Sequence, residues 1–433
     1  MNRARRIAVT GIGLVTPLGN ERASTWEGLL AGRSGCAEIE GFDASGFPTR
    51  IGAEVKGFEV NERLGDGRIL KVASRAVRFA LAAADEAFRD AGIRPTPDSA
   101  DRWGLAVGAG MMGVSFDELN EIHRWCAADG TFDPARLVAP DYPADSVAFV
   151  RSQTNAGLGV LARRFGIHGP ATAVHTACAS GGQAIGSALK LLRRGEADAI
   201  LAGGYDSMLN PLGLSAFCLL GALSTDNDRP ARASRPFDAT RNGFVLGEGA
   251  GFLVLEEWSR AVARGARIYA ELAGDGNSLS CYRITDSAPD GDGAIQAMQQ
   301  ALGDAGVTAA DIDYINAHGT STLMNDRGEC AAMTRVLGPA VDRVLVSSTK
   351  SCMGHLIAAA GAVEAAVCCL AIHHGIAPVN ANHESFDPEC AVNLVLGNSR
   401  PAPIRVALSN SFGFGGSNSS LVFRHPDAGK AAR

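Results

Sequence analysis

The sequence contains no closely spaced cysteine pair of the CxxC type, although it has ten cysteines in 433 residues. In a chain of this size, such spacing is typical of single buried or reactive thiols, and it argues against a disulfide framework or a cysteine-bound metal. The sequence also lacks an excess of positive charge, because 46 acidic residues outnumber 40 basic ones. Nucleic acid is therefore not expected as the main partner.

Long uncharged hydrophobic runs are absent as well. The longest apolar stretch, residues 356–372, carries Glu364, and the N-terminus leads straight into an apolar strand without the core of a signal peptide. The sequence GxxxxGK[ST] does not occur, so a nucleotide site of the P-loop type has little support. We expect a soluble protein located in the cytoplasm.

What the sequence does contain is a repeat of one βα unit at low identity. "ALAAADEAFRDAGI" with "ADRWGLAVGAG" (80–110) has a counterpart in "AIQAMQQALGDAGV" with "ADIDYINAHGT" (294–320). In each copy an amphipathic helix ends at DAG and leads into an apolar strand that stops at a glycine-bearing loop. Strands such as "AILAGG" are apolar throughout, as in a sheet covered on both faces. The pattern predicts an α/β fold of two related halves.

The repeat also sets the expected domain boundaries. The first half is assigned to residues 1–257 and the second to 258–425, followed by a tail at 426–433. Residues 112–152 interrupt the first half and have no counterpart in the second. Insertions of this kind often build a cap or a subunit contact.

The stretch "HTACASGGQAIGSALKLLRRG" places Cys178 directly before a predicted helix. At a helix N-terminus, free N–H groups and the positive end of the dipole favour a thiolate, which is the nucleophilic form of cysteine. A buried, inert cysteine is the more common alternative at such a position.

Two histidines strengthen the hypothesis of a reactive cysteine. His318 in "INAHGTST" follows an apolar strand, and His355 in "KSCMGHLIAAAGAVE" precedes an apolar helix. Both match the position of Cys178 in the repeat, at carboxyl ends of strands, where α/β sheets collect their active sites. Lys350 and Glu364 are a candidate ion pair beside His355, since Glu364 would be costly to bury alone, although a hydrogen-bonded structural glutamate fits equally well.

Two further stretches allow more than one interpretation. "NSFGFGGSN" near Phe414 is either a tight turn or a loop whose backbone N–H groups line an oxyanion hole. Five cations form a basic cluster, namely Arg63, Arg68, Lys71, Arg75 and Arg78, and the last four follow helical spacing. The cluster is either a solvated helix face or a dock for an acidic protein.

Five stretches, taken in order, closely resemble the elongating β-ketoacyl-acyl carrier protein synthases, type II bacterial condensing enzymes of the thiolase superfamily. They are "TACASGG", "RPFDATRNGFVLGEGAG", "NAHGTST", "SSTKSCMGHLIAAAGAVE" and "NSFGFGGSN". The likeness covers nearly the whole chain. It implies a thiolase-like, five-layered αβαβα sandwich of two similar halves. It also implies an acyltransferase that condenses an enzyme-bound acyl group with malonyl carried by acyl carrier protein, in a decarboxylative Claisen reaction.

The resemblance assigns roles to individual residues. Cys178 would hold the acyl chain, His318 and His355 would hydrogen-bond the malonyl thioester carbonyl, and Lys350 and Glu364 would orient the pocket. Backbone N–H groups of Cys178 and Phe414 would form the oxyanion hole, and the Phe414 side chain would act as a gate. Thr320, Thr322 and Thr285 would contact the phosphopantetheine, and Met111 and Met112 would line the acyl pocket. The carrier would dock at Arg68, Lys71 and Arg75. No cofactor or metal is implied, because the 4′-phosphopantetheine arrives on the carrier substrate.

Some positions depart from the family pattern. Leu323 stands where proline is common, Ala358 where glycine is frequent, and Arg283 where histidine is frequent. These changes, with the two methionines, leave the acyl chain open and permit either fatty acid elongation or a polyketide or polyene pathway. The resemblance implies a dimer, either of two identical chains or with a chain-length-factor-like subunit. The alternative function is that of a weakly catalytic or non-catalytic partner that shapes the tunnel of a second subunit.

Overall fold

The computed structural model describes residues 5–59, 64, 66–110, 116–127, 130–143, 145–285 and 288–428. Its main feature is a ten-stranded mixed sheet formed by two halves of five strands each. The first half has the spatial order β5 (Ala171–Val174), β4 (Trp103–Ala109), β6 (Ala199–Ser207), β7 (Glu248–Glu257), β1 (Ile7–Val15). The second has the order β10 (Leu345–Ser347), β9 (Tyr314–Asn316), β13 (Val406–Phe412), β14 (Ser417–Arg424), β8 (Ala270–Leu279).

The two halves have the same strand order when they are read from their outer edges. In both, the third strand in sequence lies at the edge, followed by the second, fourth, fifth and first. The first strands, β1 and β8, pair antiparallel where the halves meet, with Val9 opposite Ala270. The repeat predicted from the sequence therefore corresponds to a repeated topology, while the boundary at residue 257 stays a prediction.

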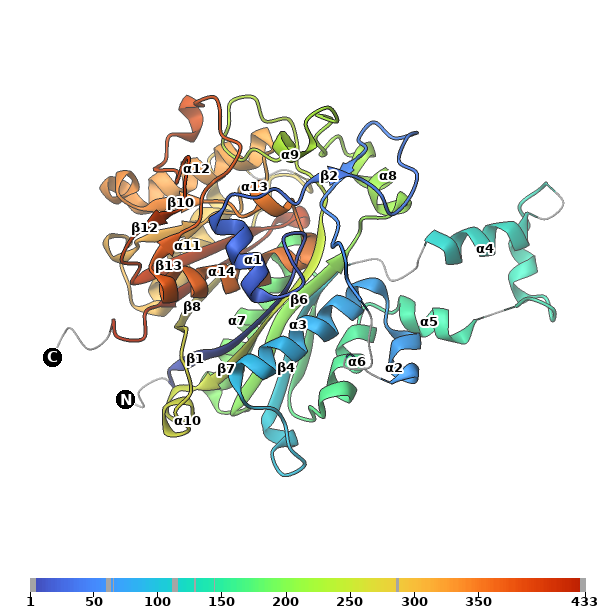
Figure 1. Cartoon of the computed structure of the whole chain (residues 1–433), viewed down its shortest axis with the longest axis horizontal. Helices are drawn as coiled ribbons and strands as arrows, with labels where there is room; N and C mark the ends of the chain where they lie inside the picture. Colours follow the sequence, from blue (N-terminus) through green and yellow to red (C-terminus); the bar gives the residue numbers. More distant parts are fainter. Residues whose placement is uncertain are drawn as a thin grey trace.

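Helices cover both faces of each half-sheet (Figure 1). The outer layers are α3 (Arg75–Ala91) and α6 (Ala156–Phe165) on the first half, and α11 (Asp292–Ala305) and α12 (Leu323–Leu337) on the second. Between the half-sheets lie α7 (Ser180–Arg194) and α14 (Ala360–His374), which pack against each other and against strands of both halves. The result is the five-layered arrangement expected from the family resemblance.

The central helix α14 explains the long apolar run in the sequence. The segment Ile357–His374 is long and apolar enough to cross a membrane, but 89% of it is buried inside the protein. Every residue of α14 up to Ile372 is buried, because the helix is packed between two half-sheets and needs apolar side chains all round. Its composition therefore reflects its place in the core.

Glycines let the two central helices approach closely. A Cβ at Gly181 of α7 would lie 2.7 Å from the backbone nitrogen of Ala362 in α14, and one at Gly361 would lie 2.8 Å from the nitrogen of Gly182. Real side-chain carbons do not come this near to backbone atoms, so only glycine permits the contact. The N-termini of α7 and α14 consequently lie side by side.

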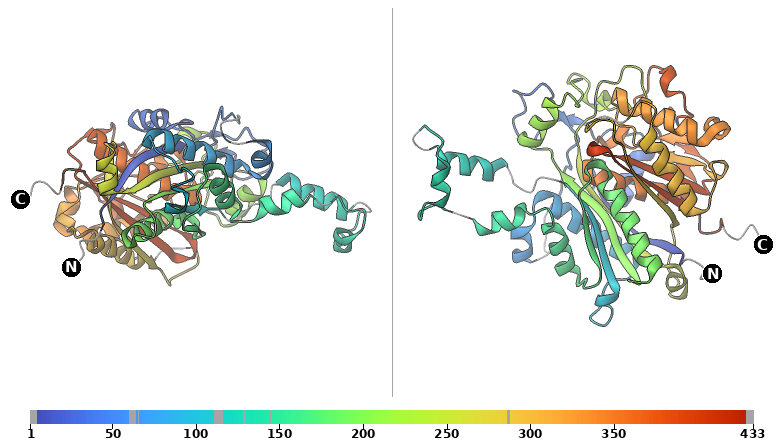
Figure 2. Two further views of the ribbon diagram at one scale, coloured as in Figure 1. Left: turned by 90° about the horizontal axis from the view of Figure 1, so that it is seen from below. Right: turned by 180° about the vertical axis from the view of Figure 1, so that it is seen from behind.

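The other elements are shorter or peripheral. They are α1 (Arg22–Leu30), α2 (Gly67–Val72), α4 (Phe116–Cys126), α5 (Ser146–Ser152), α8 (Pro211–Leu219), α9 (Pro230–Ala233), α10 (Trp258–Ala263), α13 (Lys350–Met353), β2 (Ala37–Glu38), β3 (Ile51–Gly52), β11 (Ile376–Ala377) and β12 (Arg400–Pro401). Figures 1 and 2 show that α4 extends away from the rest of the molecule. The described parts of the inserted segment predicted at 112–152 therefore form an arm that returns to the body of the protein at α5, which contacts α2 and α6.

The structure corrects the prediction of a single basic helix. Arg68 and Lys71 lie on α2, whereas Arg75 and Arg78 lie on α3. Arg63 lies outside the described residues. The chain is extended at Ala73, and the Ser74 side chain accepts a hydrogen bond from the Val77 N–H and so caps α3. A serine cap satisfies a free N–H of the first turn, which favours a new helix start over continuation of α2.

Candidate active site

Cys178 lies in the 3₁₀ turn Ala177–Ala179, directly before the first residue of α7. The preceding residue, Ala177, has a φ of +49°, a strained value for a residue with a side chain. Ser180 holds this turn, because its hydroxyl accepts the Thr176 N–H at 2.8 Å and donates to the Ala177 carbonyl at 2.6 Å. The predicted placement of the cysteine at a helix N-terminus is confirmed.

The sulfur is buried, with only 6% of the residue exposed. Burial raises the pKa of the Cys178 thiol to about 12, while the Lys350 charge and the backbone N–H of Phe414 act to lower it. The positive end of α7 acts in the same direction as these two groups. The thiolate predicted from the helix end is thus opposed by desolvation, and nearby N–H groups and positive charge are needed to stabilise it when it forms.

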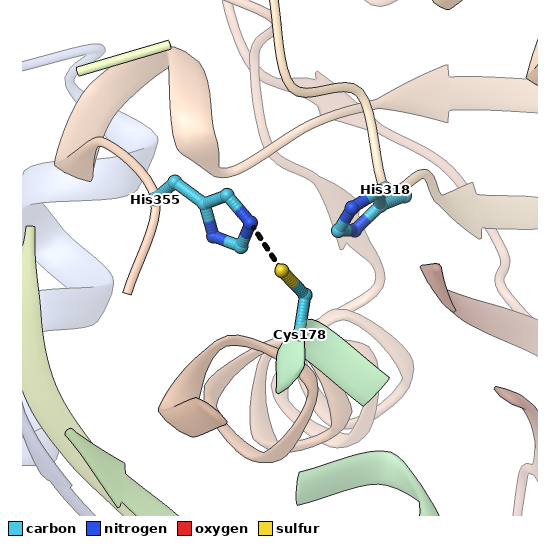
Figure 3. Close-up of side chains that lie close together, drawn as sticks. All are labelled: Cys178, His318 and His355. Carbon is cyan, nitrogen blue, oxygen red and sulfur yellow. Dashed lines mark hydrogen bonds between the residues drawn. The ribbon is translucent and has the colours of Figure 1, made fainter. Parts of the chain in front are cut away.

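His355 contacts the sulfur directly. Its Nε2 lies 3.0 Å from Cys178 Sγ, as Figure 3 shows, and its Nδ1 accepts the backbone N–H of Ile357 at 3.1 Å. A nitrogen that accepts an N–H carries no proton of its own, so in the neutral ring the proton is on Nε2. His355 therefore directs an N–H donor toward the sulfur and the cavity.

His318 is fixed in a similar way from the second half of the protein. Its Nδ1 lies 3.2 Å from Lys350 Nζ, and the Lys350 ammonium forms an ion pair with Glu364. The ammonium can only donate, so the proton of the neutral His318 ring also lies on Nε2. The predicted Lys350–Glu364 pair is present and orients His318, whereas the sequence had suggested a pair beside His355.

Both imidazoles are held in the neutral form. Burial, assisted by the Lys350 charge, lowers the pKa of each ring well below its ordinary value, and in His318 the neighbouring His355 adds to the effect. A ring nitrogen of each histidine and the cysteine sulfur lie within 4.8 Å of one another. Although this spacing would suit three metal ligands, a protonated Nε2 has no free lone pair for a metal. The arrangement is better suited to stabilising negative charge on a bound carbonyl oxygen.

The sequence analysis missed the carboxylates that hold the His318 loop. Glu329 on α12 accepts the backbone N–H groups of His318 and Gly319 at 2.8 and 2.7 Å, and Asp326 accepts that of Thr320 at 3.0 Å. Both carboxylates are buried. The two carboxylates are three residues apart and so lie on one face of α12, and the other residues on that face are apolar. This pattern is a signal in the sequence that could have identified them.

The predicted substrate-binding residues converge on one cavity of about 460 Å³, together with the three site residues. Thr320, Thr322, Thr285 and Phe414 all line it, and the Thr320 and Thr322 hydroxyls lie 2.8 Å apart. Leu323, one of the departures from the family pattern, also contributes to the wall. Met111 and Met112, predicted for the acyl pocket, lie outside the described residues.

The predicted docking residues are on α2 and α3, apart from the site residues. Arg68 and Lys71 are exposed, whereas the Arg75 guanidinium donates to both oxygens of Glu248, at 2.8 and 2.5 Å. Glu248 is buried, so Arg75 neutralises an interior carboxylate. All three side chains are exposed, but within the described part of the chain Arg75 forms an ion pair and Arg68 and Lys71 do not.

The neutral histidines predict an acid-sensitive fold. Between the ordinary histidine pKa and the lowered folded value, the unfolded chain binds protons that the folded chain does not, so stability falls as the pH decreases below about 6.5. We expect His318→Gln to remove one such contribution. As the pH decreases below about 6.5, the free energy of unfolding of the variant should therefore fall less steeply than that of the wild type, and the two slopes should differ by about 1.4 kcal/mol per pH unit. Urea unfolding at pH 7 and 5.5 measures this; equal slopes would contradict it.

Comparisons with known proteins agree with this geometry. Residues 4–261 match the model of the β-ketoacyl synthase N-terminal domain, and residues 269–384 match that of its C-terminal domain. The chain is 41% identical to 3-oxoacyl-[acyl-carrier-protein] synthase 2 of Vibrio cholerae, over 97% of this chain and 99% of that protein.

Two solved structures share the whole fold. One is a ketosynthase of a type II polyketide synthase, solved in complex with its acyl-carrier protein and bound to a hexaketide. Its TM-score is 0.87 at 32% sequence identity, and the match covers 98% of this chain and 100% of that chain. The other is the ishigamide ketosynthase/chain length factor, with a TM-score of 0.86, 35% identity and coverage of 98% and 99%. By its site, its fold and these matches, the chain belongs to the β-ketoacyl synthase family of acyl-transferring condensing enzymes.

Proposed function

We propose that this chain catalyses a decarboxylative Claisen condensation between an acyl group held on Cys178 and malonyl carried by acyl carrier protein. The observation that supports it best is the triangle of Cys178, His318 and His355 in one cavity, with both histidines directing N–H groups toward the same space. Relatives named as 3-oxoacyl-[acyl-carrier-protein] synthases support the carrier-bound substrate class. No metal or cofactor is required in this scheme.

In the first step the Cys178 sulfur attacks the thioester carbonyl of the acyl donor. The carbon–sulfur bond to the phosphopantetheine breaks, the thiol of the carrier leaves with the proton that Cys178 loses, and an acyl-cysteine remains. The Phe414 N–H, which faces the sulfur, is placed to stabilise charge in this step.

In the second step malonyl thioester binds past Thr320 and Thr322. Its carbon–carboxylate bond breaks, carbon dioxide leaves, and the electron pair forms an enolate whose oxygen accepts hydrogen bonds from His318 and His355. The enolate carbon attacks the acyl carbon and a carbon–carbon bond forms. The bond to the Cys178 sulfur breaks, its electron pair stays on sulfur, and the thiolate takes up a proton from solvent to restore the thiol. Neutral donors suit this step because they offset charge without protonating the enolate.

The direct test supplies purified chain with acyl- and malonyl-carrier proteins and measures carbon dioxide and β-ketoacyl product. Release of both supports the proposal. With verified donors, absence of both would leave the alternative, a subunit that shapes the tunnel of a catalytic partner. A panel of acyl groups of graded length and unsaturation would then separate fatty acid elongation from a polyketide or polyene pathway.

We propose that the carrier docks through the two exposed cations of α2, and that Arg75 is not part of that surface because it pairs with Glu248. Reversing both Arg68 and Lys71 to glutamate is expected to raise KM for carrier-bound substrates about tenfold and to leave KM for pantetheine thioesters unchanged. Arg335→Glu, a reversal on the exposed end of α12, is the control. Equal KM values for reversed and control proteins would exclude this docking surface.

We propose that the chain acts in the cytoplasm as a dimer, as the family resemblance implies. The arm supports an interface, since it carries exposed apolar side chains, among them Phe132, Val138 and Phe149. β5 is one of the two edge strands of the ten-stranded sheet in the described residues, the other being β10. A solution mass of twice the chain supports a homodimer; a monomer that gains activity only with a second, ketosynthase-like chain points to a heterodimer.

A further inference from the structure

The strained turn at the start of α14 lacks the serine that holds its counterpart in the first half. Ala177–Ala179 precedes α7 as Ile357–Ala359 precedes α14, and both Ala177 and Ile357 have a φ of +49°. In the first half the hydroxyl of Ser180 fixes the turn; the corresponding residue in the second is Ala360, which has no polar side chain. A β-branched residue at positive φ is costly, so another group must stabilise this turn.

This turn matters because it sets the orientation of His355. The Ile357 N–H that donates to His355 Nδ1 belongs to the strained residue itself. The φ torsion of Ile357 lies between this N–H and α14, so a relaxed φ would move His355 and the N–H together relative to α14 and to Cys178, which precedes the neighbouring helix α7. The donor directed toward Cys178 thus depends on a backbone conformation that the local sequence disfavours.

The group that holds the turn comes from β6, in the other half of the protein. Asp206 Oδ2 accepts the backbone N–H of Ala358 at 3.0 Å, and its Oδ1 accepts that of Ser207 at 2.8 Å. Ala358 is fully buried, so without the carboxylate its N–H would have no partner among the described residues. An anion at a helix N-terminus also interacts favourably with the dipole of the helix that follows.

Asp206 is an unusual residue at this place. It is 3% exposed, and no cation pairs with it in the described part of the chain, while the acidic Glu248 lies near it. Burial raises its pKa to about 7, and the two backbone N–H groups lower it. A buried carboxylate without a cation has a large desolvation cost, which its two hydrogen bonds and the helix end offset only in part. An apolar residue would avoid this cost but would leave the Ala358 N–H unpaired, so the carboxylate fits a role in holding the turn.

We infer that Asp206 is a positioning residue for His355: by holding the strained Ile357–Ala358 turn, it keeps His355 Nε2 directed at the reacting thioester. The inference rests on the proposed condensing activity. Asp206 touches neither substrate nor the reacting atoms in this role, and its effect on the rate passes through the histidine.

The test is a double-mutant cycle between Asp206→Ala and His355→Ala in the full-length protein. We expect Asp206→Ala to lower kcat of condensation about 10- to 100-fold and to change KM for malonyl-carrier protein less than about threefold, since a donor that acts in the transition state is misplaced. In the His355→Ala background the same change should cost less than about twofold, because no ring remains to be positioned.

Three further variants keep the test decisive. Asp206→Asn preserves volume and one acceptor oxygen for the Ala358 N–H, so it should retain more of kcat than Asp206→Ala does. Asp206→Leu, which has a similar shape and no acceptor, replaces Asp206→Ala if the latter does not fold. Ser207→Ala is the matched control on the same strand, since it removes only the hydroxyl that donates to Glu248 and leaves the Ala358 contact intact. Losses that add fully in the double variant, or a loss in Ser207→Ala equal to that in the Asp206 variant, would overturn the inference. An inactive wild type would instead contradict the proposed function.

Discussion

Replacing Cys178 with alanine is expected to abolish acyl transfer to the protein and to lower condensation by at least about 10³-fold, since the covalent intermediate cannot form. Incubation with acyl-carrier proteins followed by intact-mass measurement should show one acyl adduct on the wild type and none on Cys178→Ala. The change removes a buried sulfur that packs in an apolar cluster with Phe217 and Phe244, and the His355 Nε2–H that faced the sulfur is left directed into the cavity.

The matched control for this experiment is Cys281→Ala. Cys281 is exposed, whereas the other cysteines are buried or partly buried, so it is the thiol that a reactive donor would label without catalysis. We expect Cys281→Ala to keep both the adduct and the product. An adduct that persists on Cys178→Ala and disappears from Cys281→Ala would show that labelling is a surface reaction and that Cys178 is not the acceptor.

The second large effect is expected from the histidines. His318→Ala and His355→Ala should each lower kcat of condensation about 10²- to 10³-fold, the usual cost of removing one donor to a developing oxyanion. Because the enolate forms after the acyl group has been transferred, the acyl-cysteine should still accumulate in His318→Ala. Rapid-quench measurement of the adduct, together with carbon dioxide release, separates the two steps.

The tautomers in the structure sharpen this prediction. Both rings are proposed to act as neutral Nε2–H donors, so His318→Gln, which offers a neutral amide N–H, should retain more activity than His318→Ala. The rate should also stay flat as the pH falls from 8 toward 6, since burial holds the pKa of both rings well below the ordinary value. Equal activity of the alanine and glutamine variants would contradict a role of His318 as a neutral N–H donor.

Much of the site could be predicted because local patterns determine it. Cys178, His318 and His355 follow or precede apolar segments in glycine-bearing loops, and the repeat places all three at equivalent ends of strands. Glu364, the one charge in an apolar helix, required a partner, and Lys350 was the nearest cation in the sequence. These inferences rest on periodicity and on the cost of burying charge, which act over a few residues.

Other features depend on contacts between segments far apart in the sequence. Asp206 lies about 150 residues from the turn that it holds, and Arg75 more than 170 residues from Glu248, so neither role has a local signature. The break between α2 and α3 was missed because basic residues continue at helical spacing across it, while the serine cap decides where the helix begins.

The sequence by itself determined the two-fold repeat, the layered α/β fold and the choice of Cys178, His318 and His355 as candidates, because hydrophobic periodicity and residue chemistry are properties of short stretches. Only the tertiary structure decided which way the histidine protons point, which cations remain available for docking, and how a strained turn is supported. Each of those depends on a donor or acceptor brought from another element, and hydrogen-bond partners are set by the packing of the halves rather than by neighbouring residues.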